Sequence, residues 1–293
     1  MGVAENFSAF RANYIVPAAT VSTISYRYKR ITRQLNSDFW NTTSETSHSL
    51  YVGSYGRDSA AKGVSDVDMS FTLPVELYNR YNAYQGNGQS ALLQSVKNSI
   101  ARTYPNTYVG GDGQVVWVSF GDSVHFEILP VFLNQDGKSF TFADSNAGGS
   151  WRVCNPRAEM DAFGLRNSAV NGNLKSLCRM ARIWRDYHTV PLSGMLLDTL
   201  AFQFINSWQY RDKSHLYHDY MIRDFLAYLA AVDTSQQFWR APGSGSSVAK
   251  TGNFQRPAAN GHALAVSAIG HEANQRPQTA RNKWRELFGP TYP

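Results

Sequence analysis

The chain has little of what marks secreted, membrane-spanning or zinc-binding proteins. It contains two cysteines, Cys154 and Cys178, which offer no disulfide framework and lack the C-x-x-C spacing of a metal-binding pair. No basic segment followed by a long apolar run occurs near the start, so we expect neither a secretory signal nor a transmembrane helix. These absences predict a soluble protein of a reducing cytoplasm, with no membrane partner.

Two signatures of phosphate and nucleic-acid binding are also missing. There is no G-x-x-x-x-G-K-[S/T] motif, which argues against the P-loop way of holding phosphate. There is no dense run of lysine and arginine of the kind that follows a nucleic-acid backbone, so no sequence-specific nucleic-acid binding is expected. The net charge of +6 suits polyanionic ligands without choosing among them.

The most informative segment that is present runs from residue 53 to residue 73, GSYGRDSAAKGVSDVDMSFTL. From Asp66 onward polar and apolar residues alternate, and a period of two places Asp66 and Asp68 on one face of a strand. Two carboxylates this close require a cation, and hard oxygen ligands favour Mg²⁺ or Mn²⁺ over zinc. Mg²⁺ typically combines one or two carboxylates with substrate phosphates, so a nucleoside triphosphate is the expected substrate.

Gly53 and Ser54 follow a short apolar run that we predict to be a strand from Ser49 to Val52. The missing side chain of Gly53 and the backbone N–H groups of this turn let a phosphate approach closely. The hydroxyl of Ser54 can donate a hydrogen bond to the same phosphate. The sequence therefore predicts a phosphate turn that leads into a metal-binding strand, which is the arrangement expected for nucleotidyl transfer.

This pattern of G-S, a short helix, D-x-D and a later strand of the form acid-I-L-P resembles the polymerase-β-like nucleotidyltransferases. Within that superfamily the chain is most similar to the bacterial cGAS/DncV-like nucleotidyltransferases (CD-NTases), which make cyclic oligonucleotide second messengers. The likeness continues through NLKSLCRMARIWRD, PLSG and WRELFGPTYP, so it covers nearly the whole chain. It implies an α+β fold with a mixed sheet, a long spine helix and a C-terminal helical lobe.

The family pattern includes a third carboxylate, and this sequence has Glu127 where the family usually carries aspartate. Three carboxylates can bridge two ions, one that activates the attacking hydroxyl and one that holds the triphosphate and stabilises the leaving pyrophosphate. The resemblance thus assigns Asp66, Asp68 and Glu127 as metal ligands for two Mg²⁺ or Mn²⁺ ions. A half-buried Glu127 paired with a neighbouring cation is the structural alternative.

The remaining pattern predicts two lobes. A catalytic lobe is expected over residues 1–160 and a helical lobe that completes the nucleotide cleft over residues 161–293, with a surface loop from Ala241 to Gly261 before a helix near His262. A helix of about six turns, the spine, is expected after Pro17, because apolar residues recur there at spacings of three and four. The residues of this stripe are Val21, Ile24, Tyr28, Ile31, Leu35 and Phe39.

A second group of candidate residues lies on a helix predicted from Asn173 to His188. Lys175, Arg179 and Arg182 are spaced so that one face carries three like charges, which repel unless an anion compensates them. The family places basic residues of this helix against the triphosphate, commonly with lysine at the position of Arg182. A solvated basic face is the alternative interpretation.

Two further residues are candidates for contact with the nucleotide, the first of them through its match to a family position. Ser193, in Pro-Leu-Ser-Gly, matches a serine that meets the terminal phosphates from the start of a helix, although its pattern alone predicts only a helix cap. Tyr187 is a candidate surface for stacking a base, and simple packing is an equal alternative. The resemblance also implies that the cyclic product, not the protein, binds a separate effector in anti-phage signalling.

Three functions therefore stay open. The first is a synthase that joins nucleoside triphosphates, ATP and GTP above all, into a cyclic di- or trinucleotide. The second is a linear oligonucleotide synthetase or RNA nucleotidyltransferase, which would use the same carboxylates. The third is an inactive nucleotide-binding module, against which the intact Asp66 and Asp68 argue.

Overall fold

The computed structural model describes residues 3–293, and the described chain divides into two compact units. We call them the sheet unit and the helical unit. The sheet unit comprises residues 17–57 and 63–160, and the helical unit comprises residues 3–16, 58–62 and 161–293. The short segment between the phosphate turn and the D-x-D strand therefore belongs to the helical unit, although both of its neighbours in sequence belong to the sheet unit.

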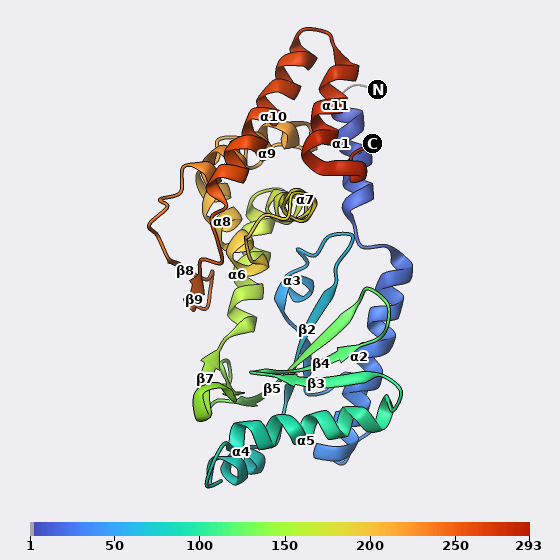
Figure 1. Cartoon of the computed structure of the whole chain (residues 1–293), viewed down its shortest axis with the longest axis vertical. Coiled ribbons are helices and arrows are strands. Elements are labelled where there is room, and N and C mark those ends of the chain that lie inside the picture. The colour runs from blue at the N-terminus through green and yellow to red at the C-terminus, as the bar shows by residue number, and fades with distance from the viewer. Residues whose placement is uncertain (1–2) are drawn as a thin grey trace. The chain divides into compact units, whose positions relative to one another are not determined.

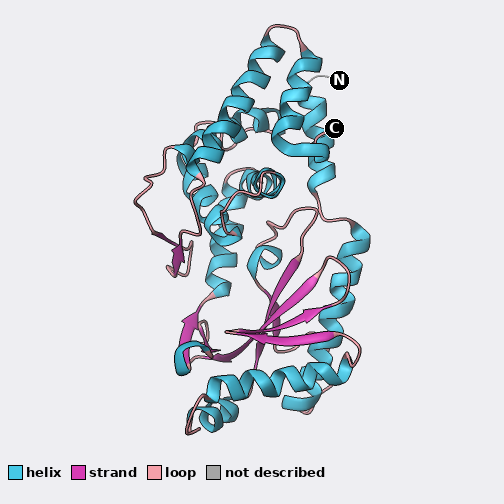
Figure 2. Ribbon diagram, in the orientation of Figure 1, coloured by secondary structure: helices cyan, strands magenta, loops and turns pink. Residues whose placement is uncertain are grey.

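The sheet unit is built on one mixed sheet (Figure 2). Its central strands are in the order β1-β2-β5-β4-β3, with β6 paired to β5 and β7 paired to β6. Strands β2 and β5 run parallel, and the other pairs are antiparallel. The strands are β1 (Ser49–Tyr51), β2 (Asp66–Thr72), β3 (Tyr108–Asp112), β4 (Val115–Ser119), β5 (His125–Leu133), β6 (Phe140–Asp144) and β7 (Ser150–Cys154).

One face of this sheet is closed by the long helices α2 (Ala18–Phe39) and α5 (Gly88–Thr103), which flank the strands in Figure 1. Ile24, Ile31 and Leu35 of the predicted spine stripe are completely buried, each contributing roughly 1.5–3 kcal/mol to stability. The stripe is confirmed except at its start, where Val21 is 39% exposed. The unit also contains α3 (Gly53–Gly56), α4 (Val75–Asn82) and a 3-10 turn, η1 (Asn146–Gly148).

The helical unit packs its helices around a separate apolar core. The predicted stripe of the 173–188 helix is confirmed, because Leu174, Leu177, Cys178, Ala181 and Trp184 are all buried. Helix α6 (Pro156–Ala169) contains the division between the units. The other elements are α1 (Val3–Tyr14), α7 (Asn173–Tyr187), α8 (Gly194–Ser207), η2 (His215–Tyr217), α9 (His218–Ala230), β8 (Phe238–Arg240), β9 (Ser247–Ala249), α10 (Gln255–Ala273), α11 (Pro277–Phe288) and η3 (Gly289–Thr291).

The prediction of a loop from Ala241 to Gly261 is wrong in its second half. Strands β8 and β9 form a hairpin around the Gly-Ser run, and helix α10 already begins at Gln255. Pro257, which suggested a loop, lies in the first turn of α10, where a backbone N–H has no partner within the helix and proline is tolerated. Within residues 3–293 no helix has both the length and the apolar character needed to cross a membrane.

Candidate active site

The acidic residues gather on one face of the sheet at the junction of β2 and β5. In the parallel register Asp68 lies opposite Glu127, and Asp66 lies opposite His125. Residues paired in this way point to the same face of the sheet, and residues two apart on a strand do so as well. The intervening Val67 and Phe126 are completely buried on the other face. Alternation thus sends the apolar side chains into the core and leaves the acids on the opposite face.

Gly53 sits directly against this acidic face. Its φ is +60°, and a Cβ atom added there would lie 1.8 Å from the Oδ2 atom of Asp68. Only glycine fits, because any side chain would collide with the carboxylate and strain the backbone. The backbone N–H of Val52 also donates to the carbonyl of Asp68 at 2.9 Å. The structure therefore brings the predicted turn, which continues through Ser54 in α3, onto the D-x-D strand.

The donor chemistry of this face suits Mg²⁺ or Mn²⁺. Asp66 is exposed and accepts a hydrogen bond from the Ser65 hydroxyl at 2.9 Å, while Asp68 and Glu127 are half-buried. Within the described chain, no three His, Cys, Asp or Glu side chains are grouped so as to hold a metal ion by themselves. Mg²⁺ does not need such a cage, since it is usually bound by one or two carboxylates with substrate phosphates and waters.

His125 is a neighbour of the acids that the sequence did not single out as a site residue. Its ring lies 4.8 Å from the ring of Trp117 on β4, measured between centroids. Its Nδ1 atom is buried and has no hydrogen-bond partner among the described residues. Its position two residues before Glu127 already makes it a residue that could tune the site, and the strand register adds that it lies opposite Asp66.

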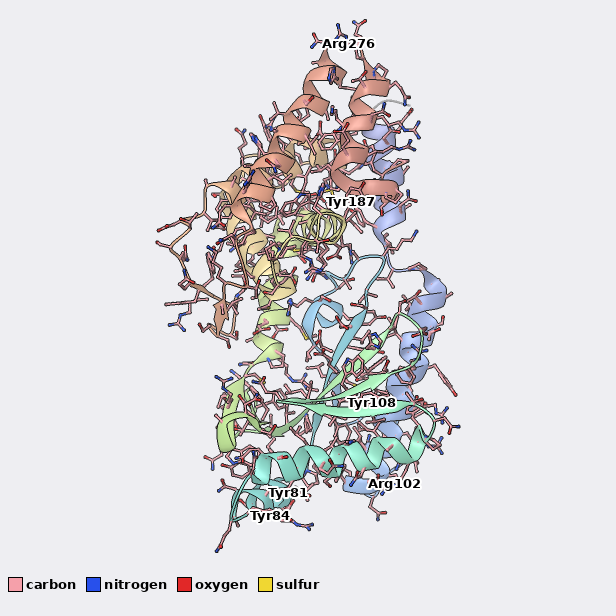
Figure 3. The ribbon with its side chains drawn as sticks, in the orientation of Figure 1. Tyr81, Tyr84, Arg102, Tyr108, Tyr187 and Arg276 are labelled. Atoms are coloured by element: carbon pink, nitrogen blue, oxygen red, sulfur yellow. The ribbon has the colours of Figure 1, made fainter. Side chains whose placement is uncertain are left out.

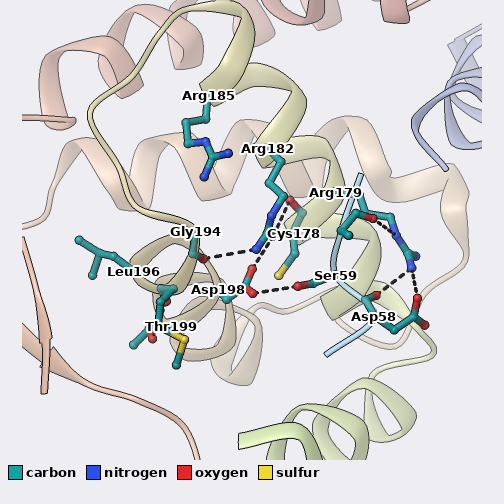
Figure 4. A network of polar contacts seen from close by, with 12 residues as sticks. Asp58, Ser59, Cys178, Arg179, Arg182, Arg185, Gly194, Leu196, Asp198 and Thr199 are labelled. Carbon is teal, nitrogen blue, oxygen red and sulfur yellow. Dashed lines mark hydrogen bonds and ion pairs between the residues drawn. The ribbon is translucent and has the colours of Figure 1, made fainter. Parts of the chain in front are cut away.

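The three cations of α7 do not form one solvated face. Lys175 Nζ donates to Asp58 Oδ2 at 3.1 Å, and Arg179 Nη2 donates to Asp58 Oδ1 at 2.6 Å. Arg179 also holds the same segment through the carbonyl oxygens of Asp58 and Ala60, at 2.8 and 3.1 Å (Figure 4). An anion does compensate this part of the helix, and it is supplied by the chain itself.

Arg182 lies in a buried network of its own (Figure 4). Its Nη1 atom donates to Asp198 Oδ1 at 2.5 Å, and Ser59 Oγ donates to Asp198 Oδ2 at 2.8 Å. Burial opposes the charge of Arg182, but the carboxylate of Asp198 outweighs it and raises the pKa of the guanidinium. The pair fixes α7, α8 and the 58–62 segment to one another within the helical unit.

Ser193 and Tyr187 occupy the ends of helices. Ser193 is the N-cap of α8, and its Oγ accepts a hydrogen bond from the Leu196 N–H at 3.2 Å, as the cap interpretation predicts. Tyr187 is the last residue of α7 and is 52% exposed (Figure 3). Gly289 packs close to this ring, because a Cβ atom there would lie 2.5 Å from Tyr187 Cδ2. The exposed remainder leaves room for stacking.

Asp58 and Asp198 are the residues that sequence reasoning missed. Asp58 adopts a φ of 53°, a left-handed conformation that aspartate tolerates better than most residues. Nothing in the local pattern links Asp58 to α7, more than 100 residues away. The one available signal was the repulsion of the three cations, which indicated that an anion was needed without saying which.

Comparison with known protein families shows which family this chain belongs to. The family model described as the Second Messenger Oligonucleotide or Dinucleotide Synthetase domain, SMODS, matches residues 1–167. The chain belongs to the SMODS family. The resemblance to the bacterial cGAS/DncV-like nucleotidyltransferases is therefore confirmed, and with it the nucleotidyltransferase class. No curated protein matches the chain by sequence.

Solved structures of this SMODS protein's relatives have the same fold at low identity. CdnC of E. coli MS115-1, solved with ATP, gives a TM-score of 0.69 at 16% identity over 99% of this chain and 98% of that one. CdnG of Bradyrhizobium diazoefficiens, in complex with GTP, gives 0.69 at 14% identity over 97% and 94%. Vibrio cholerae DncV, bound to the linear intermediate 5′-pppA(3′,5′)pG, gives 0.63 at 13% identity over 84% and 69%. The predicted fold, a nucleotidyltransferase core with a helical lobe, is confirmed.

Proposed function

We propose that this SMODS protein joins nucleoside triphosphates into a cyclic di- or trinucleotide by two-metal catalysis at Asp66, Asp68 and Glu127. One observation carries the proposal: Asp68 and Glu127 lie side by side on parallel strands, Asp66 shares their face, and Gly53 lies against Asp68. Related proteins have been solved with ATP, with GTP and with a linear intermediate, which supports these nucleotides as substrates. We further propose that the product acts on a separate effector in defence against phage.

The chemistry that two bound Mg²⁺ or Mn²⁺ ions supply is acidification of the attacking ribose hydroxyl and stabilisation of the leaving pyrophosphate. The protein's part is to hold the reacting groups. Gly53 lets the backbone of the turn approach the phosphates, and the Ser54 hydroxyl donates to them. The substitution of the usual aspartate by Glu127 keeps the same oxygen donors on a side chain that is longer by one methylene.

We assign Lys175 and Arg179 to the triphosphate, with the phosphates replacing Asp58 as their partner. Both side chains are partly exposed, at 22% and 18%, and their present carboxylate partner is 66% exposed. Exchange of one exposed anion for another leaves the free energy of folding almost unchanged, since exposed ion pairs contribute about 0–1 kcal/mol. Arg182 instead positions the helix through Asp198, because its side chain is only 6% exposed.

We also assign Ser193 and Tyr187 to nucleotide binding. The Oγ atom of Ser193 accepts the helix-cap bond, which leaves its O–H to donate to a terminal phosphate at the positive end of α8. The half-exposed ring of Tyr187 is an aromatic surface on which a base can stack.

To test this, the purified protein is incubated with the four radiolabelled nucleoside triphosphates and Mg²⁺ or Mn²⁺. The products are then treated with phosphatase and analysed by mass. We expect a phosphatase-resistant product without a free end, absent from the Asp66→Asn, Asp68→Asn double variant and retained in Glu76→Gln. Glu76 is a matched control because it is an exposed acid of the same unit. Linear products would instead assign a linear synthetase, and nucleotide binding without any product would assign an inactive binding module.

A further inference from the structure

The face of the sheet that holds the acids continues onto β4 and β3 as a strip of aromatic side chains. On β4, Trp117 lies directly opposite Glu127, and Ser119 lies opposite His125. On β3, Tyr108 lies opposite Ser119. Residues paired directly across neighbouring strands point to the same face, so Trp117, His125 and Tyr108 share the face of the carboxylates. All of them belong to the sheet unit.

The aromatic strip is open to solvent, whereas the other face of the same strands is core. Val118 and Phe126, which alternate with the strip, are completely buried. Trp117 and His125 are half-buried, and Tyr108, labelled in Figure 3, is 67% exposed. Exposed apolar side chains that are scattered singly need no explanation, but a contiguous group beside a cluster of acids indicates a binding surface.

The three rings form one connected surface. The ring centroids of Trp117 and His125 are 4.8 Å apart, and those of Tyr108 and Trp117 are 5.8 Å apart with the planes inclined at 69°. Gly110 makes room for Tyr108, because a Cβ atom there would lie 3.0 Å from Tyr108 Cε1. Opposed residues on antiparallel strands have their Cβ atoms about 4.5–5.5 Å apart, so this surface begins directly beside Glu127.

The order of the strands sets this surface on the opposite side of the acids from the phosphate turn. The order is β1-β2-β5-β4-β3, and Gly53 lies against Asp68 on β2. In phosphoryl transfer the attacking and leaving oxygens are roughly in line, on opposite sides of the phosphorus. With the leaving pyrophosphate at the phosphate turn, the attacking hydroxyl comes from the side of β5 and β4. The ribose that carries it then lies at Glu127, and its base extends towards Trp117.

We propose that Trp117 and Tyr108 form the stacking surface for the base of the attacking nucleotide and favour a purine there, an inference that rests on the nucleotidyl transfer proposed above. A planar base gains favourable contacts with an aromatic ring both when stacked and edge to face. Every base has a π-face, so all four can stack, but a purine covers more of the rings than a pyrimidine does. The donor nucleotide, whose triphosphate lies at the turn, does not use this surface.

The experiment limits the reaction to one transfer, so that each nucleotide has a single role. A labelled 2′,3′-dideoxynucleoside triphosphate, of adenosine or guanosine, can only donate, because it has no ribose hydroxyl with which to attack. A nucleoside 5′-monophosphate can only attack, because it has no pyrophosphate to release. Formation of the linear dinucleotide is measured with Mg²⁺ while the concentration of each substrate is varied in turn.

We expect the wild-type chain to have a lower KM for AMP and GMP than for CMP and UMP. Trp117→Leu should raise KM for the purine monophosphate by roughly 5- to 150-fold, the range of one base–aromatic stack, and leave KM for the dideoxynucleotide unchanged. Trp117→Phe, which keeps a ring, should retain most of the affinity, and Tyr108→Leu should show a smaller rise than Trp117→Leu. Tyr84→Leu is the matched control, because Tyr84 is an exposed tyrosine elsewhere in the same unit (Figure 3).

Three results would overturn the proposal. The first is an unchanged KM for the monophosphate in Trp117→Leu. The second is a rise in KM for the dideoxynucleotide, which would assign the rings to the donor. The third is a preference for purines that persists undiminished in Trp117→Leu.

A second readout does not depend on turnover. The fluorescence of 2-aminopurine riboside 5′-monophosphate is quenched when its base stacks on an aromatic ring, and we expect the wild-type chain to quench it and Trp117→Leu not to. Quenching that depends on Trp117 in a chain that forms no product would support the stacking surface and overturn the proposed transfer. Product formation without such quenching would overturn the stacking surface alone, and the absence of both would overturn both.

Discussion

Two clusters of like charge, one in each unit, are brought together by different kinds of structure. On the sheet, the register sets the carboxylates of Asp68 and Glu127 side by side. On α7, by contrast, Lys175 and Arg179 share the carboxylate of Asp58, and Arg182 has that of Asp198. The comparison teaches that a row of like charges in sequence does not by itself mark a binding site, because a distant segment can supply the counter-charge.

The largest effect is expected where the counter-charge is fully buried. Asp198→Asn leaves the guanidinium of Arg182 in the core without an anion, and we expect the free energy of unfolding to fall by about 3–5 kcal/mol. Denaturant titration measures this free energy. The control is Asp161→Asn, because Asp161 is an exposed acid of the same unit. A loss below 1 kcal/mol would mean that Arg182 is not held in this pair. The apolar double variant Arg182→Met, Asp198→Leu is expected to recover most of the loss.

The next largest effect tests the acidic cluster. Gly53→Ala pushes a methyl group into the Asp68 carboxylate, and we expect product formation to fall by about 10²- to 10³-fold, the scale on which one electrostatic contact to a transition state acts. Gly63→Ala is the matched control, because Gly63 has a φ of +87° but a Cβ there meets nothing within 4 Å. Equal losses of product formation in both variants would attribute the effect to backbone strain. The contact between Gly53 and Asp68 would then not be its cause.

A third prediction uses a buried base that is kept neutral, in contrast to the paired Arg182. The pKa of His218 is about 3 in the folded chain and near 6.5 when unfolded, so below pH 6.5 the unfolded state binds the extra proton. Stability therefore rises with pH in this window, and lowering the pH from 6.5 to 5 should reduce the free energy of unfolding by about 2 kcal/mol. Denaturant titrations at the two pH values measure it, and His218→Gln should lack this part of the slope. An unchanged slope in the variant would contradict the prediction.

The smallest effect is expected at the exposed anion. Asp58→Asn removes the shared partner of Lys175 and Arg179, and we expect less than about 1 kcal/mol of change in stability. If Lys175 and Arg179 bind the triphosphate, the variant makes them available to it. KM for nucleotide is then expected to fall, with little change in kcat. A raised KM would show instead that Asp58 is needed to hold the cations in place. The Asp161→Asn variant again provides the control.

Much of the sheet site could be predicted because its cause is local. The alternation from Asp66 to Phe71 specified a strand with both acids on one face, and the need for glycine at residue 53 was visible in the Gly-Ser turn. The core stripe of α7 followed from spacings of three and four for the same reason. The start of α10 was missed, since proline suits both a loop and the first turn of a helix.

The sequence by itself determined the donor chemistry of the sheet site and, through resemblance, the fold, since strand and helix periods are properties of neighbouring residues. Only the tertiary structure decided which charges are paired. The contacts that satisfy Arg179 and Asp198 span 121 and 139 residues of chain. Contacts over such distances are set by how whole elements pack together, and no local pattern records them.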